Sequence, residues 1–157
     1  MVYEQITAPS RTLVVIEPFE AWHILCLDLQ AEQVHLRPWM THAYGEQLLT
    51  SGPCFTAWAG TTVVACAGIG WCWPGRAQVW SLMSVHLPQY KWTIHRAVAS
   101  FLRGFTVRRL EFEVDPDFPR AVAWAKALGF QYESTMPAYG PNGETQDRYV
   151  RLQKGDR

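Results

Sequence analysis

The sequence has no excess of charge of either sign and no long apolar run. Its 157 residues carry 14 Lys and Arg against 14 Asp and Glu, so the formal net charge is zero. A neutral chain is poorly suited to binding nucleic acid or a membrane surface, which both call for a basic excess. Apolar runs stay short of a membrane-spanning helix, and residues 1–11 lack the pattern of a signal peptide. We therefore expect a cytoplasmic protein whose partners are neither nucleic acid nor membrane.

Metal-ligand spacings are also missing from the sequence. The cysteines Cys26, Cys54, Cys66 and Cys72 form no C-x-x-C pair, and the histidines show no H-x-x-x-H spacing. Cys26, Cys66 and Cys72 lie in apolar runs, so we expect small buried thiols in a reducing compartment and no metal. A zinc site or a catalytic cysteine is the alternative interpretation.

Glycine is missing from PQYKWTIHRA, residues 88–97, which lies between a strand-like run and a helix-like run. A strand-to-helix junction of this kind often holds an anion, because the first N–H groups of the helix and its dipole favour negative charge. Loops that let phosphate approach the backbone are usually rich in glycine. The stretch is therefore either a phosphate-binding loop that has lost its glycines or only the start of a helix.

What the sequence does contain is a clear succession of elements. Period-two and β-branched runs predict strands, steps of three and four predict helices, and Gly and Pro mark the turns between them. Strands are expected at 12–18, 54–60, 63–73, 77–85, 108–114 and in a hairpin around Asn142-Gly143, and helices at 19–29, 41–50, 91–104 and 119–128. Thr41 is placed to cap the second helix, and Gly129 to end the last one.

In this order the elements resemble the GNAT N-acetyltransferase fold over nearly the whole chain. The stretch RAVAWAKALGFQYE is similar to the family's helix that ends in Gly-Phe before a strand. VHLPQYK is similar to its strand end followed by Pro, an amide residue, an aromatic and a basic residue. The resemblance implies one domain over residues 1–157, of mixed α+β type, with a twisted mixed sheet of about six or seven strands and helices on both faces. Strand 79–85 should then lie beside 109–114 and parallel to it.

The same resemblance implies an acyl-CoA-dependent N-acyltransferase with an acceptor that the sequence does not identify. The pantetheine arm of acetyl-CoA would bond to the backbone near 83–85, and the phosphates would reach 89–93. The implied cofactor-binding residues are Met83, Ser84, Val85, Gln89, Tyr90, Lys91, Trp92 and Thr93.

The cofactor loop departs from the family's pattern, which has a basic residue followed by alternate glycines. Lys91 fills the basic position, whereas Trp92, Ile94 and Arg96 stand where glycines are expected. Glycine is used there because backbone N–H groups must approach the phosphates closely. We therefore predict that Trp92 narrows the pyrophosphate cradle and that acetyl-CoA binding is weakened, while Lys91 and Arg96 partly compensate with charge.

Proton transfer is the second departure. The family's tyrosine that can protonate the departing thiolate falls on Ala125, and its asparagine falls near Phe118. Tyr132 or Tyr139 could take the place of that tyrosine.

No residue stands out as a general base. The candidates are Glu17, His86 and Asp115, which lie at predicted strand ends, and Glu113. Glu113 shares one face of its strand with Glu111, and the simpler interpretation of that pair is a solvated sheet face.

A catalytically inactive GNAT-fold protein is the alternative function. The closing stretch YGPNGETQDRYVR is similar to the end of small GNAT-like proteins of tailed bacteriophages, some of which are head or internal virion proteins. That resemblance implies a phage assembly or virion protein, located in the bacterial host cytoplasm or the virion. The chain also has eight tryptophans. Several of them are expected to form an exposed apolar patch for a protein partner or a second copy, namely Trp39, Trp58, Trp71, Trp73, Trp80 and Trp92.

Overall fold

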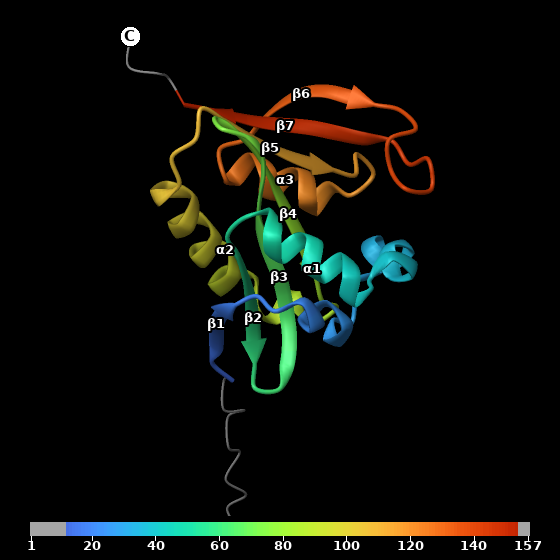
Figure 1. The fold of residues 1–157 in the computed structure, drawn as a ribbon, viewed down its shortest axis with the longest axis vertical. Coiled ribbons are helices and arrows are strands. Elements are labelled where there is room, and N and C mark those ends of the chain that lie inside the picture. The colour runs from blue at the N-terminus through green and yellow to red at the C-terminus, as the bar shows by residue number, and fades with distance from the viewer. Residues whose placement is uncertain (1–11, 154–157) are drawn as a thin grey trace, which may run out of the picture.

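In the computed structural model, which describes residues 12–153, seven strands form one sheet in the order β1-β2-β3-β4-β5-β7-β6 (Figure 1). The strands are β1 (Val14–Pro18), β2 (Cys54–Ala59), β3 (Thr62–Trp73), β4 (Arg76–Met83), β5 (Arg109–Val114), β6 (Gln131–Met136) and β7 (Gln146–Leu152). The helices are α1 (His42–Ser51), α2 (Leu87–Gly104) and α3 (Pro119–Ala127), with two 3-10 helices, η1 (Ala21–Cys26) and η2 (Ala31–Trp39). None of the described helices is long and apolar enough to cross a membrane.

The expected parallel pair lies at the centre of the sheet. β4 and β5 are parallel neighbours, whereas the other pairs of adjacent strands are antiparallel. The β4–β5 pairing begins at Arg76 and Arg109 and ends at Val79 and Phe112. Both strands continue beyond that point, so they separate. This confirms the mixed sheet and the predicted neighbours, and it opens the sheet at one place.

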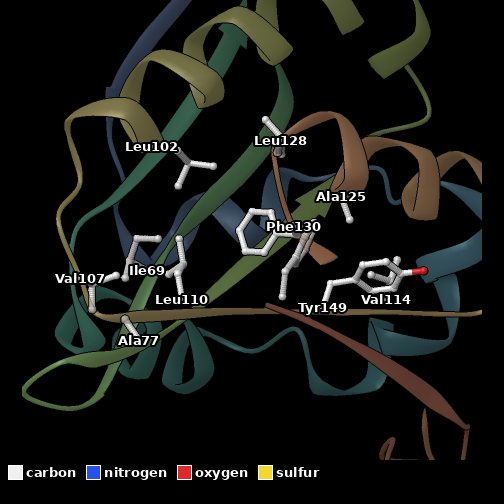
Figure 2. Close-up of a cluster of buried hydrophobic side chains, with 11 residues drawn as sticks. Ile69, Ala77, Leu102, Val107, Leu110, Val114, Ala125, Leu128, Phe130 and Tyr149 are labelled. Carbon is white, nitrogen blue, oxygen red and sulfur yellow. The ribbon is translucent and has the colours of Figure 1, made fainter. Parts of the chain in front are cut away.

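Helices cover both faces of this sheet. Successive strand residues point to opposite faces, and both faces carry apolar side chains that the helices bury. On the face covered by α2 and α3, Leu102 and Ala125 pack with Leu110, Phe130 and other buried residues (Figure 2). On the opposite face, residues of η1 and α1 pack against β2, β3 and β4 in a second cluster that contains Ile24, Leu48, Val63, Cys66 and Leu82.

Local signals in the sequence set several of the helix ends. Thr41 Oγ1 accepts a hydrogen bond from the Tyr44 N–H at 3.2 Å, which confirms the predicted N-cap of α1. Gly129, with φ +88°, ends α3 in the left-handed region that glycine adopts readily. Gly45 is needed for close packing, since a Cβ there would lie 2.2 Å from the Ala21 carbonyl oxygen.

The helix predicted over 19–29 is wrong in type. The buried residues Ala21, Ile24 and Leu27 recur every three positions, which suits the three residues per turn of a 3-10 helix. Trp22 and Cys26, which belong to the predicted stripe, are exposed.

The burial predicted for two cysteines is also wrong, because Cys26 and Cys72 are exposed while Cys54 and Cys66 are buried. Burial raises the pKa of the Cys66 thiol to about 12, so this thiol is kept protonated.

The helix after β4 begins earlier than the sequence predicted, at Leu87 rather than Lys91. A proline at the start of a helix costs no hydrogen bond, and Pro88 occupies such a position. Trp92 and Ile94 therefore lie in the second turn of α2 and not in a loop. Ile94 is only 4% exposed and packs in the core with Ala65 and Met83.

Candidate functional site

A large cavity opens where β4 and β5 separate. It has a volume of about 790 Å³. Its walls come from the ends of β4 and β5, from α2 and α3, from η2, and from the loop between β6 and β7. The parallel strands thus expose their diverging ends to one cleft, and helices or loops enclose it from both faces of the sheet.

The wall on the helix side is aromatic and carries a cation. Trp92 and Trp124 line the cleft together with Lys91 and His95. The Trp124 Nε1 donates to His95 Nδ1 at 3.1 Å, and the Lys91 Nζ lies 5.3 Å from the centre of the Trp92 ring. Trp92 is 65% exposed, so its indole lies at the rim rather than inside the core.

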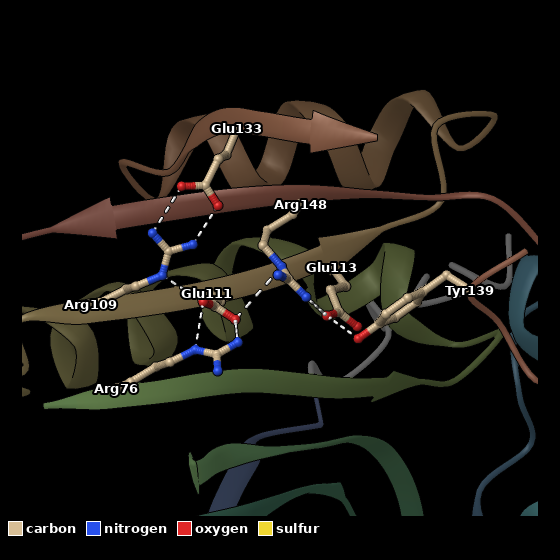
Figure 3. A network of polar contacts seen from close by, with 7 residues as sticks. All are labelled: Arg76, Arg109, Glu111, Glu113, Glu133, Tyr139 and Arg148. Carbon is tan, nitrogen blue, oxygen red and sulfur yellow. Dashed lines mark hydrogen bonds and ion pairs between the residues drawn. The ribbon is translucent and has the colours of Figure 1, made fainter. Parts of the chain in front are cut away.

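The opposite wall carries a carboxylate held in a fixed orientation. Glu113, on β5, accepts from the Tyr139 hydroxyl at 2.6 Å and from Arg148 Nη2 at 3.0 Å (Figure 3). Both bonds end on Oε1, and among residues 12–153 Oε2 has no hydrogen-bond partner. Burial, followed by the hydrogen bond to Glu113, raises the pKa of Tyr139, so its hydroxyl keeps its proton. Glu113 can therefore offer one free oxygen to a ligand in the cleft.

Behind this wall lies a buried carboxylate ringed by arginines (Figure 3). Glu111 is 1% exposed and accepts from Arg76 Nε at 2.8 Å and from Arg109 Nε at 2.6 Å. Burial by itself raises the pKa of Glu111, but the hydrogen bonds from Arg76 and Arg109 outweigh it and lower that pKa to about 2. Arg109 also pairs with Glu133. The predicted solvated face is therefore wrong for Glu111, because the side chains of Arg76, Arg109 and Arg148 surround its carboxylate and form ion pairs with it.

The other proposed bases lie in different places. Asp115 lines the cleft, but its Oδ1 accepts from the Asp117 N–H at 2.8 Å and so closes a local turn. His86 is exposed and precedes α2. Glu17 is exposed on the edge strand β1, away from β5. Of the four candidates, the fold brings only Glu113 and Asp115 to the cleft.

Of the cofactor-binding residues that the resemblance implies, some line the cleft and others do not. Met83, Lys91 and Trp92 line the cleft, whereas Ser84, Val85, Gln89, Tyr90 and Thr93 are outside its lining. Of the two tyrosines that could replace the family's proton donor, Tyr139 reaches the cleft and Tyr132 lies on β6, bonded to Thr135.

The N-terminus of α2 has its first donors engaged. The Leu87 N–H donates to the Ser84 carbonyl oxygen at 3.0 Å, and the His86 N–H donates to Ser84 Oγ at 3.0 Å. Pro88 has no N–H, and the Gln89 N–H donates to the His86 carbonyl oxygen at 3.3 Å. These groups are not directed outward, so this helix start is a poor cradle for phosphate.

Sequence reasoning missed Gln33, on η2. Its side chain reaches the diverging end of β4, where Nε2 donates to the Ser81 carbonyl oxygen at 2.9 Å and Oε1 accepts from the Met83 N–H at 2.8 Å. The two partners are 48 and 50 residues away in sequence, so no local pattern could have indicated the contact.

Exposure of the tryptophans is mixed. Trp39, Trp71, Trp73 and Trp92 are at least 42% exposed, whereas Trp58 and Trp80 are partly buried. Trp71 belongs to a row of aromatic rings on the α2 side, in which Phe55–Phe101, Phe101–Phe105 and Phe105–Trp71 lie 5.5, 5.6 and 5.5 Å apart.

Comparison with known proteins shows which solved structures share this fold. No family model matches the chain, and no curated protein matches it by sequence. Solved structures match it well. Ard1 from Thermoplasma volcanium has a TM-score of 0.72 at 17% identity, covering 88% of this chain and 97% of its own. The ribosomal-protein-S5-alanine acetyltransferase from Vibrio fischeri has a TM-score of 0.67 at 14% identity, covering 90% and 94%. A GNAT-family acetyltransferase from Bacillus anthracis has a TM-score of 0.65 at 13% identity, covering 91% and 95%. The chain thus has the GNAT acetyltransferase fold.

Proposed function

We propose that this protein is an N-acyltransferase that moves an acyl group from acyl-CoA to an amine and holds the acyl donor weakly. The observation that carries the proposal is the cleft of about 790 Å³ between the diverging ends of β4 and β5, with Glu113 on its wall. Acetyl-CoA is the donor expected from the fold. In the proposed reaction the amine nitrogen attacks the thioester carbonyl carbon, and the carbon–sulfur bond breaks with its electron pair remaining on sulfur.

Glu113 has the place and the free oxygen to take the proton from the attacking nitrogen. Its Oε1 is held by Tyr139 and Arg148, which leaves Oε2 for the amine. Tyr139 and Arg148 act here as positioning residues, because they fix the carboxylate at the wall. The aromatic lining keeps water away from the thioester and supplies apolar contact for the acyl chain.

Fit to the acyl donor is incomplete in this structure. The cleft has the room, and Lys91 supplies a positive charge at its rim. However, Gln33 already bonds the backbone of Ser81 and Met83, and the first N–H groups of α2 are engaged. These two features support weakened binding of acetyl-CoA.

The proposal is tested by incubating the protein with acetyl-CoA and a panel of primary amines and following the release of free thiol. Glu113→Gln should lower kcat about 100-fold, the usual size of a lost general base. The exposed Glu46 of α1 provides a matched control, and Glu46→Gln should leave kcat unchanged. Absence of thiol release with every amine, in a folded protein, would argue against the enzyme.

A catalytically inactive binding protein, such as a phage assembly or virion component, is the second proposal. The observation that favours it is the partly exposed aromatic row Phe55, Phe101, Phe105 and Trp71. Such a row suits a protein partner or a second copy of the chain. Failure to bind acetyl-CoA, together with self-association through this row, would favour it over the enzyme.

A further inference from the structure

The edge of β4 beyond its pairing with β5 is already occupied by the chain itself. The Gln30 N–H donates to the Met83 carbonyl oxygen and the Val85 N–H donates to the Asp28 carbonyl oxygen, both at 2.9 Å. Between β4 and the chain before η2, Leu29 and Ser84 form an isolated antiparallel bridge. Segment 28–30 therefore bonds to the last part of this edge through its backbone.

The next groups along the same edge are bonded by a side chain instead. Gln33 supplies one donor and one acceptor, and these meet the Ser81 carbonyl oxygen at 2.9 Å and the Met83 N–H at 2.8 Å. A carboxamide carries the same two groups as a peptide unit, so Gln33 pairs with β4 as one residue of a neighbouring strand would. The Gln30 side chain holds it in place by donating from Nε2 to Gln33 Oε1 at 3.1 Å.

This arrangement defines what the edge recognises. A carbonyl oxygen and an N–H on one strand edge bind an extended chain that has successive secondary amides, in the way a peptide adds to a sheet edge. The pantetheine arm of an acyl donor carries secondary amides of this kind. Gln33 and the residues it bonds, Ser81 and Met83, all line the same cleft.

We propose that Gln33 is an internal competitor for the amide groups of the acyl donor, and that its side chain must leave the β4 edge before the donor binds there. This inference rests on the proposed use of acyl-CoA. Gln33 is half-buried, and in this proposal its side chain leaves the edge by rotation about its own bonds. Two amides of the donor then restore these hydrogen bonds, one by donating its N–H to the Ser81 carbonyl oxygen and the other by accepting from the Met83 N–H. Because bonds are exchanged rather than gained, the affinity of the donor is low.

The test compares acetyl-CoA binding to the unmodified protein, to Gln33→Ala and to Gln47→Ala by calorimetry. Gln47 lies exposed on α1 and is a matched control for loss of the same side chain. Gln33→Ala should bind acetyl-CoA about tenfold more tightly, since two competing hydrogen bonds are removed. Gln47→Ala should bind as the unmodified protein does.

A second measurement uses the unmodified protein, so that it stands even if Gln33→Ala fails to fold. The side-chain NH₂ resonances of Gln33 should move toward their solvent-exposed positions as acetyl-CoA is added. Measurable and equal affinity in the unmodified protein and Gln33→Ala, or unmoved Gln33 resonances when acetyl-CoA binds, would overturn the competitor and leave the proposed function standing. If neither protein binds acetyl-CoA at millimolar concentration although both are folded, the proposed use of acyl-CoA and the proposed competition by Gln33 are both overturned.

Discussion

Glu111 has surroundings that its position in the sequence does not indicate. In an alternating strand it should face solvent, yet it is 1% exposed and bonded by Arg76 and Arg109. A charge buried in this way is costly to leave without its partners. The carboxylate thus joins β4 to β5 just before the point where they separate.

Glu111→Gln should lower the free energy of unfolding by about 3 kcal/mol, because the arginines lose their buried counter-charge. Urea denaturation measures this directly. Glu133→Gln is the matched control at the exposed end of the same network, and it should cost no more than about 1 kcal/mol. Equal effects of the two substitutions would contradict the assignment of Glu111 as the centre of the network.

The same carboxylate predicts a loss of stability in acid. The pKa of Glu111 is lowered from 4.5 to about 2 in the folded protein. Its contribution is therefore fully present above pH 4.5 and is lost as the pH falls toward 2. The free energy of unfolding should fall more steeply across this window in the unmodified protein than in Glu111→Gln.

His23 should make the stability of the protein depend on pH in a second range, nearer neutrality. Its Nδ1 accepts from the Glu20 N–H at 3.0 Å and lies 2.8 Å from Thr56 Oγ1, so a proton there would face another donor. Burial lowers the pKa of His23 below 6.5, although Glu20 and Glu17 act in the opposite direction. The unfolded chain then binds more protons below pH 6.5, and stability falls as the pH drops through that value.

Thermal unfolding measured between pH 7 and 5 tests whether His23 causes this loss of stability. His23→Gln should be less sensitive to pH in this range than the unmodified protein. The exposed His42 of α1 is the control, and His42→Gln should keep the full dependence. If His23→Gln keeps the same pH dependence of stability as the unmodified protein, that dependence arises from other groups.

At the scale of elements, α2 decides what residues 88–97 do. All of residues 88–97 lie in α2, in agreement with the interpretation as a helix start, so Trp92 is an exposed helix residue and Ile94 a core residue. The absence of glycine therefore reflects a helix that begins close to β4. Replacing both residues with glycine, which the loop interpretation invites, would damage the core at Ile94.

Trp92→Ala is the informative change in α2. It should tighten acetyl-CoA binding a few-fold by clearing the rim of the cleft, at little cost in stability, because alanine favours helix. Ile94→Ala should instead lower the free energy of unfolding by about 2–4 kcal/mol, since it leaves a cavity in the core. Calorimetry measures the change in acetyl-CoA binding, and urea denaturation measures the change in stability. Weaker binding in Trp92→Ala would contradict the prediction and show that the indole contacts the ligand.

For the whole molecule, the aromatic row across β2, β3 and α2 is the feature that bears on association. Its ends, Phe55 and Trp71, are 37% and 47% exposed. If a second copy covers the row, sedimentation at high micromolar concentration should detect a dimer, and Trp71→Glu should return it to monomer. Trp39→Glu on η2 is the control, and it should leave the dimer intact. A monomer at every concentration would contradict pairing of two copies through this row.

The sequence by itself determined the order of the elements and several helix ends, and the resemblance of that order to the GNAT fold implied the parallel pairing of β4 with β5. The elements and the helix ends depend on signals within a few residues, such as alternation in 109–114, the cap at Thr41 and the left-handed Gly129. Tertiary structure alone decided which polar side chains meet at the cleft. Gln33 reaches Ser81 across 48 residues, and Tyr139 reaches Glu113 across 26. Contacts at such separations arise from packing of whole elements, so no local pattern encodes them.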